Sequence, residues 1–263
     1  MTRLLAGVLG ILLAVTLTAH AAEPGLDREP YPDEKKAFEL LVKTKSPAAR
    51  RYLAWIRHDH AIRLIRSYHQ TQNLADLDVG IGYAQSATEL APDVAAFWRV
   101  LAMGAMSLPK GDLTPLIAES ALVRVLEIEP DDRISRRRLI DHYVGLGEYA
   151  EAVPHFIKLM KTLEEDHFDF DAVKMAYACM EGERIGLCRA ELEQTVEARP
   201  ALADARIALA ILYRTQQLEG RALKTIQGVV SDAKASPEAK AAAKQLAAHW
   251  KKVGPIGVGE DRP

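Results

Sequence analysis

The sequence predicts an all-α fold in which antiparallel helix pairs stack into a solenoid. The chain of 263 residues is rich in Ala and Leu and poor in the alternating β-branched pattern of strands. Well-spaced prolines mark the helix joints, with Pro92 and Pro130 separated by 38 residues and Pro200 and Pro237 by 37. The apolar pattern recurs at the same interval, which is typical of a repeat array.

The N-terminus has the pattern of an export signal. A positive start, Met1 to Arg3, precedes the apolar run Leu4 to Leu17, and Ala19-His20-Ala21 has the small-x-small form of a cleavage site. The run is shorter than the roughly 20 apolar residues of a membrane anchor. We therefore expect residues 1–22 to be a cleaved signal peptide rather than an uncleaved anchor. A periplasmic or secreted location follows, with no membrane span in the mature chain.

The charge balance argues against a nucleic-acid partner. The formal net charge is −2 at pH 7, whereas binding to phosphates requires a concentrated basic face. The tight basic cluster Arg136-Arg137-Arg138 is interpreted as a solvated helix face.

The clearest repeat unit follows Pro130. Its large and small packing residues are Leu139, Tyr143, Ala152 and Phe156, and Gly147 supplies the left-handed residue that ends the first helix. Position for position this unit resembles a tetratricopeptide repeat, and similar patterns cover most of residues 61–236. The resemblance implies a right-handed superhelical solenoid with about four to five repeats and a C-terminal capping helix.

The repeats divide the chain as follows. Residues 23–46 are expected to be extended or partly ordered, and 47–92 to form a degenerate N-terminal helix pair. The repeats themselves are predicted at 93–130, 131–168, 169–202 and 203–236. A capping helix at 237–253 and a disordered tail at 254–263 complete the chain.

The two cysteines lie almost symmetrically about a predicted hairpin turn. Cys179 is near the end of one helix and Cys188 near the start of the next. In an oxidising compartment an even cysteine count favours a structural bridge. We predict a disulfide between them, with reduced thiols as the alternative.

No pattern in the chain predicts catalysis. It lacks a Gly-rich phosphate loop, a Gly-x-Ser-x-Gly elbow and a His-Glu-x-x-His helix. His58 and His60 are two residues apart and point to different faces of a helix, so they are not expected to share a metal. We predict a protein that is not an enzyme, with no cofactor and no metal site.

The resemblance implies that the first helix of each pair lines a concave groove. The predicted groove is apolar with a few arginines, which is typical of partner sites. It lacks the asparagines with which some family members clamp a C-terminal carboxylate. The residues mapped onto it are Arg99, Met103, Met106, Ile134, Arg137, Asp141, Val144, Phe170, Val173, Tyr177, Met180, Ile207, Ile211 and Arg214. An open alternative is that several of them pack against neighbouring repeats or a terminal helix.

The resulting hypothesis is a periplasmic scaffold or adaptor that holds a segment of another protein. Envelope assembly, secretion and maturation complexes are the candidate settings. Two alternatives stay open: a self-associating homo-oligomer, and a solenoid that binds a lipid or a small molecule.

Overall fold

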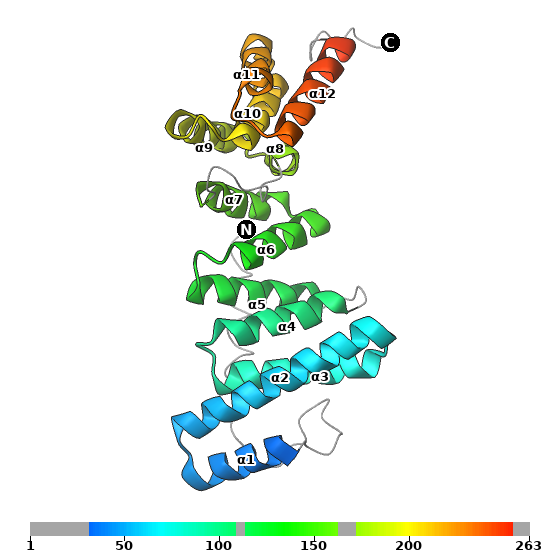
Figure 1. Cartoon of the computed structure of the whole chain (residues 1–263), viewed down its shortest axis with the longest axis vertical. Coiled ribbons are helices and arrows are strands. Elements are labelled where there is room, and N and C mark those ends of the chain that lie inside the picture. Colours follow the sequence, from blue (N-terminus) through cyan, green and yellow to red (C-terminus); the bar gives the residue numbers. More distant parts are fainter. Residues whose placement is uncertain (1–31, 109–113, 163–171, 255–263) are drawn as a thin grey trace, which may run out of the picture. The chain divides into compact units, whose positions relative to one another are not determined.

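The computed structural model describes residues 32–108, 114–162 and 172–254, all of which form helices or short connections (Figure 1). Twelve helices and no strand lie in these ranges. The predicted signal peptide and most of the predicted tail lie outside them. The chain divides into unit 1, residues 1–118, and unit 2, residues 119–263. No helix in the described ranges is both long and apolar enough to cross a membrane.

Unit 1 is built around the long hairpin of α2 and α3. Ser46 begins α2 by accepting the backbone N–H of Ala49, and Pro47 occupies the first turn, where its missing N–H costs nothing. Phe97 of α4 is fully buried against Ala54, Ala87 and neighbouring residues. The helices of this unit are α1 (Pro32–Thr44), α2 (Pro47–Thr71), α3 (Leu74–Leu90) and α4 (Ala95–Ser107), and the division between the units falls within α5 (Thr114–Ile128).

α1 lies within residues 23–46, which were expected to be extended or partly ordered. Residues 32–44 form a regular helix. Only one apolar residue of α1, Ala37, is buried, so the apolar pattern that reveals a core helix is nearly absent. The helix is held instead by polar contacts to distant residues, which no local pattern shows.

Unit 2 consists of the larger part of α5, three helix hairpins and a final helix. Asp132 begins α6 by accepting the N–H groups of Ile134 and Ser135, and Gly147 ends it with φ of 77°. The helices are α6 (Arg133–Leu146), α7 (Tyr149–Lys161), α8 (Ala172–Glu181), α9 (Ile185–Ala198), α10 (Ala203–Thr215), α11 (Glu219–Ser231) and α12 (Pro237–Val253).

The packing residues of the repeat behave as predicted. Leu139 and Ala152 are fully buried, and Tyr143 and Phe156 nearly so. The small residues Ala176, Ala210 and Ala222 are also fully buried, which allows the helices of each hairpin to approach closely. The prediction of an all-α array of helix pairs is confirmed for the residues that the structure describes.

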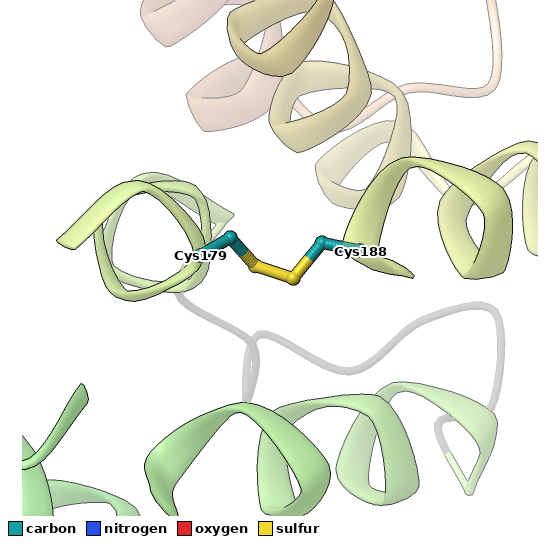
Figure 2. Close-up of a disulfide and its surroundings, with 2 residues drawn as sticks. All are labelled: Cys179 and Cys188. Atoms are coloured by element: carbon teal, nitrogen blue, oxygen red, sulfur yellow. A yellow bond between two sulfur atoms is a disulfide. The ribbon is translucent and has the colours of Figure 1, made fainter. Parts of the chain in front are cut away.

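The predicted disulfide is also confirmed. The sulfur atoms of Cys179 and Cys188 are 2.00 Å apart and join the end of α8 to the start of α9 (Figure 2). Both residues are fully buried. The bridge closes a short loop with a sequence separation of 9, so it fixes one hairpin and no longer-range contact.

Candidate functional site

The last helix covers part of the predicted groove. Ile207 and Arg214 of α10 are only 2% and 5% exposed, so they do not line an open surface. The Arg214 guanidinium donates 2.9 Å to a Glu219 carboxylate oxygen and also to the backbone carbonyl of Gly254, just beyond α12. It lies 5.1 Å from the ring centroid of Trp250 on α12. Ile207 and Arg214 therefore follow the alternative in which groove residues pack within the protein, and for Arg214 the covering element is α12.

The middle of unit 2 keeps an open face, which we call the α6–α8 surface. It is formed by Ile134 and Asp141 of α6 with Val173, Lys174 and Tyr177 of α8. Ile134 and Val173 are 67% and 53% exposed, so this surface presents large apolar side chains to solvent. The Lys174 ammonium donates to the Asp141 carboxylate at 2.8 Å, which links the two helices by an exposed ion pair.

The remaining groove residues fall in several places. Arg137, Val144, Met180 and Ile211 are half-buried in unit 2. Arg99, Met103 and the exposed Met106 belong to α4 in unit 1, and Phe170 lies outside the described residues.

A cavity of about 560 Å³ lies beside this surface. It is formed where the α6–α7 turn, the start of α7 and the α8–α9 turn meet α5. Five of its lining residues are glutamates and none is basic. We call it the acidic cavity; its lining is Glu119, Gly147, Glu148, Tyr149, Ala150, Glu151, Glu181, Gly182 and Glu183.

Two tyrosines connect the cavity with the α6–α8 surface. Tyr149 lines the cavity, and its ring meets that of Tyr177 edge to face with centroids 5.3 Å apart. A hydrogen bond to Tyr149, followed by the charge of Glu181, raises the pKa of Tyr177. An apolar, aromatic surface and a negatively charged cavity are therefore continuous.

The glutamates also affect the interior of unit 2. Burial raises the pKa of Tyr143, and so does Glu119, whose carboxylate accepts a hydrogen bond of 3.0 Å from the Tyr143 hydroxyl. The charges of Glu151 and Glu148 act in the same direction. Glu148 precedes α7 but makes no capping hydrogen bond with its side chain, so its carboxylate is available to the cavity.

Gly182 allows the cavity to form. A Cβ atom at this position would lie 2.8 Å from the backbone nitrogen of Ala150 and 2.8 Å from the carbonyl oxygen of Ala178. Both neighbours are backbone atoms, so no side-chain rotation can relieve the clash. The absence of a side chain therefore lets the α8–α9 turn touch the start of α7.

Replacing this glycine is expected to destabilise unit 2. Gly182→Ala forces two helix ends apart and costs about 1–3 kcal/mol, the usual range for overpacking. Urea unfolding followed by circular dichroism measures the loss. Gly186→Ala is the matched control, since a Cβ there meets nothing within 4 Å. Equal stability of the two variants would contradict the close packing at Gly182.

His155 is expected to make stability depend on pH. Burial, followed by the positive charge of Arg136, lowers its pKa from 6.5 to about 4. The unfolded chain therefore takes up a proton at this residue between about pH 6.5 and 4, while the folded chain does not. The free energy of unfolding should fall as the pH is lowered through this range. His155→Phe should weaken that fall, and the exposed His249→Phe should leave it unchanged.

The acidic cavity is not evident from the sequence. Its glutamates lie in two hairpin turns about 35 residues apart and on α5, and turn glutamates are ordinarily solvated. The recurrence of acidic residues at equivalent turns of successive repeats was the available signal. Among the residues that the structure describes, no three His, Cys, Asp or Glu side chains form a group that could hold a metal ion.

Comparisons with known proteins give a likeness in structure alone. No model of a protein family matches the chain, and no curated protein sequence matches it. The chain is similar to the crystal structure of YrrB, described as a TPR protein with an unusual peptide-binding site. The two share 14% sequence identity at a TM-score of 0.46, over 83% of this chain and 99% of the other. The assignment of the fold rests on the helix bounds and buried repeat residues given above.

Proposed function

We propose that this protein is a non-catalytic scaffold that binds a polypeptide segment on the α6–α8 surface and in the acidic cavity. The observation that carries the proposal is the continuity of the two features through the Tyr149–Tyr177 contact. Exposed aromatic and aliphatic side chains are the usual anchors of a protein interface. A carboxylate cluster alone could bind many kinds of cation. A carboxylate cluster that borders an aromatic and apolar surface favours a peptide that carries both a basic and an apolar side chain.

The charges define the kind of segment. The cavity lining contains five carboxylates and no basic side chain, which favours a Lys or Arg side chain of the partner. Apolar residues a few positions from that basic residue would lie against Tyr177 and then Val173, which are exposed. The bound segment is therefore basic and apolar in alternation, rather than acidic.

Tyr177 should be central to this binding. An array of short peptides with varied basic, acidic and apolar positions identifies a bound sequence, and fluorescence anisotropy then measures its affinity. Tyr177→Ser is expected to weaken binding about tenfold, as loss of an aromatic anchor does. Glu181→Gln should weaken it less and make it less sensitive to salt.

Tyr52→Ser provides the matched control, because Tyr52 is an exposed tyrosine of unit 1. It should bind the peptide as the wild type does. Equal losses for the two tyrosine variants, or retention of acidic peptides in preference to basic ones, would refute the assignment. Binding of lipid vesicles without any peptide binding would favour the lipid-binding alternative.

The proposed setting is the periplasm or the extracellular space, within an envelope assembly, secretion or maturation complex. The export-signal pattern of residues 1–22 and the Cys179–Cys188 disulfide support it, since such bridges persist in oxidising compartments. Mass spectrometry of the protein recovered from its host should find an N-terminus at Ala22 or Glu23. An intact Met1 in the membrane fraction would indicate an anchor instead.

A further inference from the structure

α1 is attached to unit 1 by few apolar contacts. Its buried residues are Glu34 and Ala37. The methyl group of Ala37 is therefore the one buried apolar side chain that α1 contributes. Phe38, Leu40 and Val42 are each more than 40% exposed. A helix of 13 residues is marginal in isolation, so its docking to α2 and α3 must come from other interactions.

A buried carboxylate cluster supplies them. One Glu34 carboxylate oxygen accepts from Arg57 Nε of α2 at 3.0 Å, and the other accepts from the Tyr83 hydroxyl of α3 at 2.9 Å. The Arg57 guanidinium also donates to the Ser86 hydroxyl of α3. Glu34 and Arg57 are 4% and 8% exposed, so both charges have lost nearly all of their water.

A second polar contact lies one residue earlier. Asp33 Oδ1 is 3.4 Å from Nε2 of His60, which is buried and packs against the Tyr83 ring with centroids 5.5 Å apart. The start of α1 is thus joined to α2 and α3 through Glu34, and Asp33 lies close to the buried His60 ring.

Such a contact opens more easily than an apolar one. Undocking an apolar helix exposes two apolar surfaces to water, and that cost grows with the area. Undocking α1 returns Glu34 and Arg57 to water, which regains the hydration that both charges lost on burial. Opening of α1 therefore requires no disruption of the α2–α3 hairpin beneath it.

We propose that α1 is a releasable cap over a carboxylate-binding surface formed by Arg57, Tyr83 and Ser86. When α1 leaves, the two donors that already converge on one carboxylate, Arg57 and Tyr83, face the solvent, with Ser86 accepting from the Arg57 guanidinium. The surface then accepts a helix of a partner protein with a carboxylate and, three residues later, a small residue. Glu34 and Ala37 occupy these two positions in the closed state.

Hydrogen exchange of the full chain tests the release. The amides of α1 should exchange faster than those of α2 and α3 in the wild type, because α1 opens on its own. Glu34→Gln keeps the shape and removes the charge, and should accelerate exchange in α1 about tenfold without affecting α2 and α3. Asp93→Asn, which breaks the exposed Arg51–Asp93 ion pair of the same unit, should leave α1 unchanged.

Two outcomes would overturn the release. One is exchange of α1 at the same rate as α2 and α3 in the wild type. The other is equal acceleration of all three helices by Glu34→Gln, which would make the cluster part of the common core.

A labelled peptide of residues 32–44 tests the acceptor surface. Its affinity for the full chain should be about tenfold higher when the chain carries Glu34→Gln, because more of the surface is then open. When the peptide itself carries Glu34→Gln, it should no longer bind the Glu34→Gln protein. A peptide that carries Phe38→Ala should still bind that protein, since Phe38 is exposed on α1. Failure of the unmodified peptide to bind the variant chain would refute the acceptor surface.

Discussion

Trp250→Ala is expected to destabilise unit 2 by about 3–5 kcal/mol, the usual range for truncating a buried aromatic side chain. Trp250 is 6% exposed and is the largest buried side chain of α12. Its ring also covers the Arg214 guanidinium, which would lose a cation–π contact along with its shield from water. Urea unfolding followed by circular dichroism measures the change.

His249→Ala is the control, since it changes the exposed neighbour of Trp250 on the same helix. That variant should unfold within about 0.5 kcal/mol of the wild type, as surface substitutions usually do. In Trp250→Ala, hydrogen exchange should increase in α10 as well as in α12. A loss below about 1 kcal/mol would mean that α12 is not an integral part of the unit.

Removing the disulfide should have the next largest effect. The double variant Cys179→Ala with Cys188→Ala is expected to lower the free energy of unfolding by about 2.5–3 kcal/mol, because the unfolded chain regains the conformational entropy that the short loop had lost. The loss should be concentrated in α8 and α9, whose ends the bridge joins. Thermal unfolding with and without a reductant measures it.

The two conditions provide the control. The reductant should lower the Tm of the wild type towards that of the double alanine variant and leave the variant itself unchanged. Identical melting of the wild type in both conditions would show that the thiols are reduced in the protein as isolated. Peptide binding should weaken with the loss of the bridge, because Tyr177 is two residues before Cys179 on α8.

Several features of the fold follow from local sequence. Helix caps such as Asp132 and Ser236 and the left-handed Gly147 act within one turn of the residues they cap, so they are readable along the chain. The repeat spacing likewise identifies the hairpins, because the two helices of a hairpin are close along the chain. It also places Cys179 and Cys188 on facing helix ends, where a hairpin brings them within disulfide distance.

Exposure, by contrast, was decided by tertiary packing. Ile207, Arg214 and Val173 all lie on first helices, yet only Val173 is exposed. Arg214 is buried because Trp250 of α12 covers its guanidinium. Helical periodicity identifies a face but cannot tell which neighbour packs against it.

The sequence by itself determined the helix pairs, their caps and the bridged hairpin, because these depend on residues close along the chain. The spatial grouping of the charged side chains depends on the tertiary structure. It gathers glutamates of separate turns into the acidic cavity and brings Glu34 to Arg57 and Tyr83, which are 23 and 49 residues away. The Coulomb energy and hydration of these groups depend on distance in space and on burial, neither of which follows from sequence separation.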